Sequence, residues 1–483
     1  MMHGKSIEDV GREVPSAENT VDRAVKQLKS NYNLRLLGNS QDGHIYISEE
    51  ERSANFHILG APGEGKSKFL EYHIRRDIEM GNGLCLIDPS EKGDTARNVL
   101  NYCAKIGYEK VILIDPRLIS EYKKVPAIAP LNVKSVKRSV EGVMEALSIL
   151  FDVKATATPR IKRFLSALLR ILASQNLTLK EARYFSDYHR DLPERMAILG
   201  SDRDSSAIRN LFRSEYKYDN FFSSSINRLD VIWQEPLSSI LGNSEGINFK
   251  RAVADGWVIL VNLSPYQLTE DEAELLGIIV LSQIIQAVDA LVNNQWQGVF
   301  YLYIDEAGRF ATPQIETLLS YKRKSGLRLY LAHHHFDQFE GKKKVLSSIE
   351  NNARIKLMFD TPNYDDRMKM IKALGYGGDI PPLMAAYANQ NISKQHGVLK
   401  KNKETPIRIR IPDVPNAPDA PKEYIEKILS QSFYKDARQP APAREERENT
   451  ATPRPGAAND GKTNRKAGVS NRKNNSNKWK DVS

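Results

Sequence analysis

Cysteine is scarce in this chain, and its scarcity excludes two classes of protein. Only two cysteines, Cys85 and Cys103, occur among 483 residues. Small domains stapled by disulfides and zinc sites built from thiolates both need more cysteines at close spacing. Both thiols are therefore expected to be buried as small hydrophobic groups in a protein from a reducing compartment.

The chain also lacks a long apolar segment without polar residues. Its most apolar stretch, Leu275 to Val292, carries Gln283, Gln286 and Asp289. Such a segment is typical of a buried helix and not of a membrane span. The N-terminal residues are polar and partly acidic, unlike a secretory signal. We therefore expect a cytoplasmic protein with no integral membrane segment.

The net positive charge is small except at the end of the chain. The formal net charge is +10, and residues 437–483 hold 11 Lys and Arg against 5 Asp and Glu, which is +6 of that total. Composition therefore does not predict a strongly basic groove in the rest. Residues 433–483 have almost no large apolar side chains, which predicts a disordered basic tail. Such a tail either contacts nucleic acid or serves solubility.

One loop matches a phosphate-binding pattern. Gly60, Gly65, Lys66 and Ser67 fit G-x-x-x-x-G-K-[ST], between an apolar strand-like stretch and a helical one. The glycines let successive backbone N–H groups point at a triphosphate, and the helix that begins near Lys66 adds its positive end. Lys66 would reach the β- and γ-phosphates, and Ser67 would hold Mg²⁺. The alternative is a glycine-rich turn that matches by chance. The expected nucleotide-binding residues are Gly60, Ala61, Pro62, Gly63, Glu64, Gly65, Lys66 and Ser67.

A second nucleotide-site pattern follows the apolar stretch Val299 to Ile304, which ends in Asp305 and Glu306. Asp305 would support the Mg²⁺ shell, through water, and Glu306 would orient and deprotonate the attacking water. This pattern is weak by itself, since many buried strands end in an acid. Together with the phosphate-binding loop it indicates hydrolysis of a nucleoside triphosphate.

Short apolar stretches alternate with helical ones over much of the chain, which predicts a parallel α/β sheet covered on both faces. Residues just beyond the carboxyl ends of such strands line the ligand crevice. Asp88 is therefore expected beside the phosphate-binding loop, unless it only caps its own loop. The stretch 407–411 alternates like an exposed edge strand. The strands are expected at 44–47, up to 59, 83–88, 111–115, 257–262, 299–304, 327–332, 354–359 and 407–411.

Strand-like stretches are nearly absent from the middle of the chain, where three segments show helical spacing. This pattern predicts an all-α insertion within the nucleotide-binding domain. The expected divisions are 1–40 (N-terminal polar and helical segment), 41–134 (first half of the domain), 135–250 (insertion), 251–432 (second half) and 433–483 (tail).

Three adjacent histidines, His333, His334 and His335, could suggest a metal site. However, neighbours on a strand point to opposite faces, and no suitable ligands accompany them.

With both nucleotide motifs placed, the chain resembles the HerA/FtsK superfamily of ring-forming, DNA-pumping P-loop ATPases. Its nearest likeness is to the type IV coupling proteins of conjugation, which are TraD/TraG-like. The resemblance covers about residues 40–430 and implies a RecA-like sheet, ATP and Mg²⁺ as cofactors, DNA as a partner, and a homohexamer. It rests on motifs at 60–67, 87–94, 299–306, 322–327 and 332–338.

The resemblance also implies roles for individual residues. Glu306 and Asp305 would run hydrolysis. Arg323 matches the arginine finger that reaches the γ-phosphate of the neighbouring subunit, the alternative being a solvated charge at a helix end. Gln338 matches a glutamine that senses the γ-phosphate. Two features depart from the family: His334 stands where the third motif usually opens with a glutamine, and no N-terminal transmembrane helices are expected.

Three functions fit these motifs. The leading hypothesis is a DNA translocase for conjugative transfer, working with a relaxase or other type IV secretion components. The second is a soluble HerA-like translocase that acts in repair or genome defence with a nuclease. The third is a scaffold that binds nucleotide with little turnover, which the intact Lys66, Asp305 and Glu306 disfavour.

Overall fold

The computed structural model describes most of the chain between residues 34 and 437. The chain divides into one compact unit, residues 1–437, and a second unit, residues 438–483. Three predictions lie outside the described residues: the helical part of the N-terminal segment, Arg323, and nearly all of the basic tail. The described ranges are 34–91, 93–132, 135–150, 159–185, 197–213, 229–321, 326–375 and 394–437.

The core is a sheet in which the described residues form eleven strands. Seven neighbouring strands, from β10 to β5, run parallel, and the other four pair antiparallel at one side. The predicted α/β class is therefore confirmed, and all nine predicted strands are present. In sheet order the strands are β2 (Gly43–Ile47), β1 (Arg35–Ser40), β12 (Ile407–Arg410), β11 (His396–Lys401), β10 (Ile355–Met358), β3 (Phe56–Leu59), β9 (Leu327–His333), β8 (Phe300–Ile304), β4 (Gly83–Asp88), β7 (Val258–Asn262) and β5 (Val111–Ile114).

The parallel strands β8, β4, β7 and β5 are mainly apolar on both faces because helices cover both. Side chains alternate between faces along a strand. In β4, Leu84 and Leu86 join one apolar cluster, and Cys85 and Ile87 join another on the opposite face. The first cluster includes residues of α3 (Lys66–Glu79), α4 (Asp94–Ile106) and α18 (Lys422–Leu429). The second includes residues of α6 (Val136–Leu150), α7 (Pro159–Ser174), α11 (Leu237–Leu241), α12 (Phe249–Ala254), α13 (Glu270–Val292), α14 (Pro313–Tyr321) and α15 (Lys343–Asn352).

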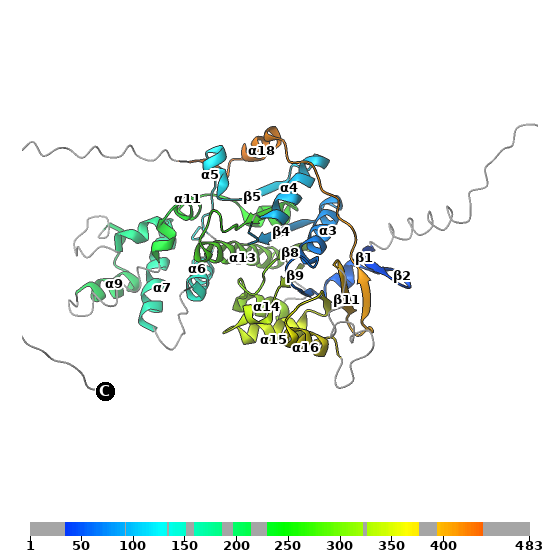
Figure 1. Cartoon of the computed structure of the whole chain (residues 1–483). Helices are drawn as coiled ribbons and strands as arrows, with labels where there is room; N and C mark the ends of the chain where they lie inside the picture. Colours follow the sequence, from blue (N-terminus) through cyan, green and yellow to red (C-terminus); the bar gives the residue numbers. More distant parts are fainter. Residues whose placement is uncertain are drawn as a thin grey trace, which may run out of the picture. The chain divides into compact units, whose positions relative to one another are not determined.

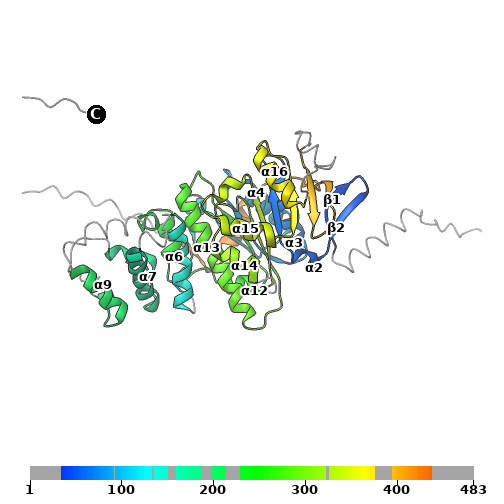
Figure 2. The same cartoon turned by 90° about the horizontal axis from the view of Figure 1, so that it is seen from below.

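The described residues between α6 and α12 form helices and no strand, as predicted for the insertion. Helices α13, α6, α7 and α9 (Arg203–Arg213) follow one another side by side (Figures 1 and 2). The apolar side chains of α6 and α7 belong to the same cluster as those of α13. These helices therefore extend the core of the sheet and do not form a separate one. The remaining helices are α2 (Glu49–Arg52), α5 (Arg117–Tyr122), α16 (Tyr364–Ala373) and the 3₁₀ segments Leu179–Phe185 and Phe336–Phe339.

Helix α13 is the one described helix that is long and apolar enough to cross a bilayer. Its most apolar window is 72% buried inside the protein, and its residues lie across one face of the sheet. The prediction of a buried core helix is therefore confirmed. Two polar residues within it bond neighbouring main-chain segments. Gln283 and Gln286 donate side-chain hydrogen bonds to the carbonyl oxygens of Pro130 and Arg138 at 3.3 and 3.1 Å.

Two sequence predictions need correction. The stretch 407–411 was expected to be an exposed edge, but β12 lies between β1 and β11 inside the sheet. Its alternation reflects an antiparallel strand with one apolar face, where Ile409 is buried. The predicted tail also begins too early, because Tyr434–Asp436 forms β13, which pairs with β6 (Lys124–Pro126). Tyr434 is buried, and its hydroxyl bonds both the N–H and the carbonyl of Leu113 on the edge strand β5.

A buried ion cluster, consisting of Arg35, Arg52, Asp77 and Tyr303, ties β1, α2, α3 and β8 together. Asp77 lies 2.8 Å from Arg35 Nη1 and 2.9 Å from Arg52 Nη2, and it accepts a hydrogen bond from the Tyr303 hydroxyl. Asp77 and Arg52 are fully buried. Burial by itself would raise the pKa of the Asp77 carboxyl, but Arg52 and Arg35 outweigh burial and hold this pKa well below its ordinary value.

Candidate functional site

The phosphate-binding loop joins β3 to α3 at the carboxyl edge of the parallel strands, as predicted. Helix α3 begins at Lys66. Gly65 has a φ of 124°, which disfavours a residue with a Cβ atom. A Cβ atom on Gly60 would lie 2.6 Å from Cβ of Phe359, which follows β10. The two glycines are therefore required for different reasons, the first by backbone conformation and the second by close packing against the neighbouring strand.

Lys66 lies folded back onto its own loop. Its Nζ donates to the carbonyl oxygens of Gly60 at 2.6 Å and Ala61 at 3.0 Å, and lies 2.7 Å from Nδ1 of His334. Burial lowers the pKa of the Lys66 amine to about 8, against the attraction of Asp305 and Glu306. A triphosphate would supply the negative charge that this buried amine lacks.

Ser67 and Asp305 lie side by side, as the two motifs predicted. The Ser67 hydroxyl donates to Asp305 Oδ2 at 2.9 Å, although the two residues are 238 positions apart. A hydroxyl and a carboxylate are hard oxygen donors of the kind that Mg²⁺ prefers. Among the described residues no group of three or more His, Cys, Asp and Glu side chains could hold a metal ion. A Mg²⁺ ion here would therefore need phosphate oxygens and water to complete its shell.

Glu306 is held in an unusual backbone conformation and between two cationic or potentially cationic groups. Its φ is +49°, the left-handed region that is uncommon for residues other than glycine. Its carboxylate lies 3.5 Å from Arg309 Nη1 and 3.7 Å from His334 Nε2. Burial raises the pKa of the Glu306 carboxyl, but His334 and Arg309 outweigh burial, so the pKa lies below its ordinary value. The group is therefore an ionised and partly exposed carboxylate.

Asp88 lies beside this site but bonds its own loop. Its carboxylate accepts from the backbone N–H groups of Ser90 at 3.0 Å and Ala96 at 2.8 Å. Burial, with a contribution from Asp305, raises the pKa of Asp88 to about 6. The alternative interpretation, that this acid caps a loop, therefore describes the contacts that Asp88 makes.

The three adjacent histidines have three different sets of partners. His333 Nδ1 lies 3.1 Å from the carbonyl of His335, and its Nε2 lies 2.7 Å from Nε2 of His57 in β3. His335 contacts Asp366 at 3.2 Å, whereas His334 faces Lys66 and Glu306. Burial holds the pKa of His333 down to about 3, so this ring is neutral. The sequence argument against a shared metal site is consistent with this divergence.

One further residue belongs to the site, and one predicted residue makes a contact that its motif did not predict. The sequence interpretation missed Arg309, which lies against Glu306 and is 3.6 Å from Glu274 of α13. No local signal marks it. Gln338 uses its amide oxygen to accept from the backbone N–H of His334 at 2.9 Å. It therefore holds the main chain of His334, and His334 presents the ring that faces Lys66. Together Lys66, Ser67, Asp305, Glu306 and His334 are called the nucleotide edge below.

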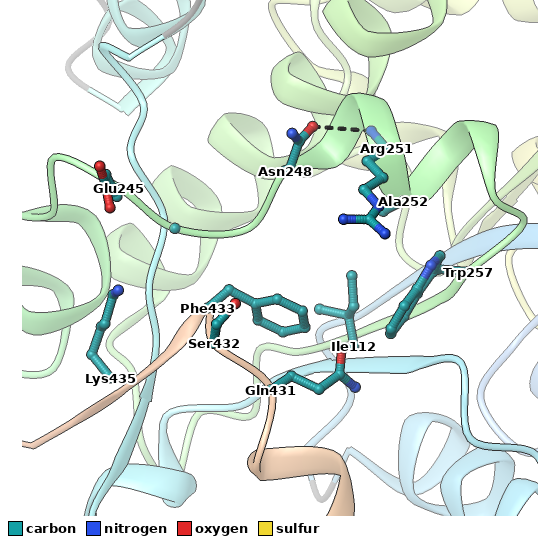
Figure 3. A pocket seen from close by; sticks show the side chains of 11 residues that line it. Ile112, Glu245, Asn248, Arg251, Ala252, Trp257, Gln431, Ser432, Phe433 and Lys435 are labelled. Atoms are coloured by element: carbon teal, nitrogen blue, oxygen red, sulfur yellow. Dashed lines mark hydrogen bonds between the residues drawn. The ribbon is translucent and has the colours of Figure 1, made fainter.

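A separate pocket of about 510 Å³ lies away from the nucleotide edge (Figure 3). It opens between Trp257, which precedes β7, and the C-terminal residues Gln431 to Lys435, with Arg251 of α12 above it. Phe433 lies against Trp257 with ring centroids 6.3 Å apart. No residue of the nucleotide edge lines this pocket. The convergent charged groups, and not this pocket, therefore mark the candidate catalytic site.

Only the comparison with solved structures finds proteins that are similar to this chain. No protein-family model matches the chain, and no curated protein sequence matches it. The bacterial conjugative coupling protein TrwB, in an unbound form, superimposes with a TM-score of 0.58 at 14% identity, over 82% of this chain and 92% of that chain. TrwB with a non-hydrolysable ATP analogue gives 0.59 at 13% identity, over 81% and 93%. The chain has the fold of TrwB.

VirB4 of Thermoanaerobacter pseudethanolicus shares this fold as well. Its TM-score is 0.52 at 18% identity, over 79% of this chain and 96% of that chain. The predicted resemblance to coupling proteins of conjugation is thus confirmed at the level of the fold. Because the identities are so low, the roles of individual residues depend on the geometry described above.

Proposed function

We propose that this protein hydrolyses ATP with Mg²⁺ and uses the energy to move DNA during conjugative transfer. The observation that carries the proposal is the convergence of Lys66, Ser67, Asp305 and Glu306 at one sheet edge, from motifs more than 230 residues apart. TrwB structures have been solved with an ATP analogue and with ADP and Mg²⁺. The similarity of fold to TrwB and VirB4 favours a motor of type IV secretion.

Four side chains of the nucleotide edge have a defined task in this proposal. Lys66 exchanges the carbonyls of Gly60 and Ala61 for the phosphates, and the loop amides bind the phosphate oxygens. Ser67 and Asp305 hold Mg²⁺, which neutralises phosphate charge when it is bound. Glu306, ionised and partly exposed, orients a water molecule and accepts its proton.

The resemblance adds a ring to this picture. Arg323 would reach the γ-phosphate bound by a neighbouring subunit of a homohexamer. We place the protein in the cytoplasm, with DNA as its substrate and a relaxase or other secretion components as its partners. The domain boundaries at 41–134, 135–250 and 251–432 belong to the same proposal.

Steady-state ATP hydrolysis with and without DNA tests the proposal. The parent protein should hydrolyse ATP faster with DNA, and Lys66→Ala should abolish hydrolysis while its thermal unfolding stays like that of the parent. Arg323→Ala should lower turnover by ~10³–10⁵-fold. Mixing Arg323→Ala with Lys66→Ala subunits should restore part of the activity, since some interfaces then pair an intact loop with an intact finger. Hydrolysis that no DNA stimulates would contradict a DNA motor, and nucleotide binding without any hydrolysis would support the scaffold.

A further inference from the structure

His334 lies between the two groups that the proposed function makes most important. Its Nδ1 is 2.7 Å from Nζ of Lys66, and its Nε2 is 3.7 Å from Oε1 of Glu306. One imidazole ring therefore contacts the phosphate-binding lysine with one nitrogen and approaches the water-activating carboxylate with the other. The backbone N–H of His334 is held by Gln338, which fixes the strand end that carries the ring.

The contacts of the ring determine where its proton lies. Nδ1 of His334 also lies 3.3 Å from the carbonyl oxygen of Gly60, but its shorter contact is with Nζ of Lys66 at 2.7 Å. A lysine ammonium has only donors, so Nδ1 of His334 accepts from Lys66 and carries no proton. A neutral imidazole then carries its proton on Nε2, which points at the Glu306 carboxylate. The nucleotide-free arrangement thus requires neutral His334, because a proton on Nδ1 would place two donors against each other.

Binding of a triphosphate reverses this requirement. A phosphate-binding lysine directs its donors to the β- and γ-phosphates, so Lys66 has to release Nδ1 of His334. A γ-phosphate oxygen bound by Lys66 then lies within one hydrogen bond of a ring nitrogen that was itself bonded to Nζ. Phosphate oxygens are acceptors, and an unprotonated Nδ1 would face them with its lone pair.

We propose that His334 takes up a proton when ATP binds, so that its Nδ1 donates to the γ-phosphate while its Nε2 holds Glu306 in place. This inference rests on the proposed function for its ligand, but it adds a property that the function does not require. The proton comes from solvent and returns to solvent when the γ-phosphate leaves. ADP lacks the γ-phosphate, so ADP binding takes up no proton at this residue. His334 is thereby a positioning residue for Glu306.

The charged groups around His334 support the uptake of a proton by its imidazole only when the triphosphate is present. Lys66 disfavours an imidazolium, and the Glu306 carboxylate favours one, while Arg309 beside Glu306 offsets part of that attraction. The γ-phosphate adds negative charge and draws Lys66 away from Nδ1, which changes the balance. The other titratable groups nearby are the adjoining His333 and His335, and Asp305 and Glu64, which act on Lys66.

The test measures nucleotide affinity against pH in the absence of DNA. Dissociation constants for a non-hydrolysable ATP analogue and for ADP, both with Mg²⁺, are determined from pH 5.5 to 7.0 for the parent, His334→Gln and His335→Gln. This range lies below the pKa of about 8 of the Lys66 amine, so Lys66 stays charged throughout. In the parent, affinity for the analogue should strengthen as the pH falls, by at most about tenfold per pH unit where one full proton is taken up. Affinity for ADP should not follow this trend.

His334→Gln should remove the pH dependence of the affinity for the ATP analogue, since glutamine fills a similar space but does not titrate. His335→Gln is the matched control because the adjacent ring faces Asp366 and not Lys66, and it should retain the parent profile. An equal pH dependence in the parent and His334→Gln would overturn the inference and leave the proposed function standing. A parent that binds no nucleotide at any pH would overturn both.

Calorimetry keeps the inference testable if His334→Gln does not fold. ATP-analogue binding to the parent near pH 7 is measured in two buffers with different ionisation enthalpies. The apparent binding enthalpy should differ between the buffers for the analogue and coincide for ADP. Coinciding enthalpies for the analogue would mean that no proton is taken up, and the inference would be wrong.

Discussion

The charged groups near the two ends of helix α3 differ in burial and in the distance to their counter-ions. At its N-terminal end, Lys66 is a member of the nucleotide edge. Asp77, eleven positions later and therefore roughly 16 Å along the helix axis, is a member of the buried ion cluster. In the cluster, Asp77 has two arginines within 3 Å and is fully buried. At the nucleotide edge, Glu306 has its cationic neighbours at 3.5 and 3.7 Å and remains partly exposed.

This difference separates a structural group from a functional one. The acceptor sites of Asp77 are taken up by side chains of three other elements, so no ligand can use them. Glu306 and Lys66 instead have contacts that a ligand would replace in the proposed function, since only carbonyl oxygens and an imidazole hold the Lys66 amine. Charge burial thus stabilises the fold at one end of α3, while the other end keeps charges available for chemistry.

The largest expected effect comes from Glu306→Gln, which should lower ATP turnover by ~10²–10⁴-fold, the usual worth of general-base help. The free energy of unfolding should stay near that of the parent, because the carboxylate makes no contact shorter than 3.5 Å to a cation. Steady-state hydrolysis and urea unfolding measure the two quantities. Glu316→Gln on α14 serves as the control and should match the parent in both. Parental turnover in Glu306→Gln would show that another group activates the water.

Asp77→Ala should have the opposite profile, with a loss of ~3–5 kcal/mol in the free energy of unfolding. The substitution leaves Arg35 and Arg52 buried without their shared counter-ion. Asp94→Ala is the matched control, because Asp94 pairs with Arg97 on the surface, where both side chains are about half exposed. That pair should contribute at most ~1 kcal/mol. Equal losses of stability in the two variants would show that the buried ion cluster contributes no more than a surface ion pair.

A smaller effect is expected for Tyr303→Phe, which removes one hydroxyl from the same cluster. The Tyr303 hydroxyl donates to Asp77 and accepts from Arg52 Nη2 at 3.1 Å. A hydrogen bond to a buried charged group is worth ~1.5–3 kcal/mol, which sets the expected loss of stability. Nucleotide affinity should not change. The exposed Tyr364→Phe, measured by the same unfolding experiment, should leave stability within experimental error.

The smallest effect is the acid dependence of stability. The pKa of Asp77 is lowered in the folded protein, so its contribution is present above the unfolded pKa, near 3.9, and is lost as the pH falls below that value. Asp77 should therefore add a slope of at most about 1.4 kcal/mol per pH unit to unfolding below pH 4. Unfolding curves for the parent and Asp77→Ala between pH 2 and 6 should converge toward acid. Parallel curves would mean that folding leaves the pKa of Asp77 unchanged.

Much of the nucleotide edge was predictable from the sequence because its signals are local. The glycine spacing before Lys66 predicts a turn that only certain backbone conformations allow, and the apolar stretch before Asp305 predicts a buried strand ending in an acid. Both predictions are confirmed in position. The burial of α13 was also predictable, because a few polar residues within an apolar helix exclude a bilayer.

The sequence by itself determined most of the elements, including nine strands of the sheet, since helix and strand periodicity depend on near neighbours. Only the tertiary structure decided that β3 lies beside β9, which brings His334 to Lys66 across 268 positions. It also placed β12 inside the sheet, brought Arg309 into contact with Glu306, and buried Tyr434 against the edge strand β5. These contacts depend on strand order, and strand order follows from the packing of the whole core, which no local pattern records.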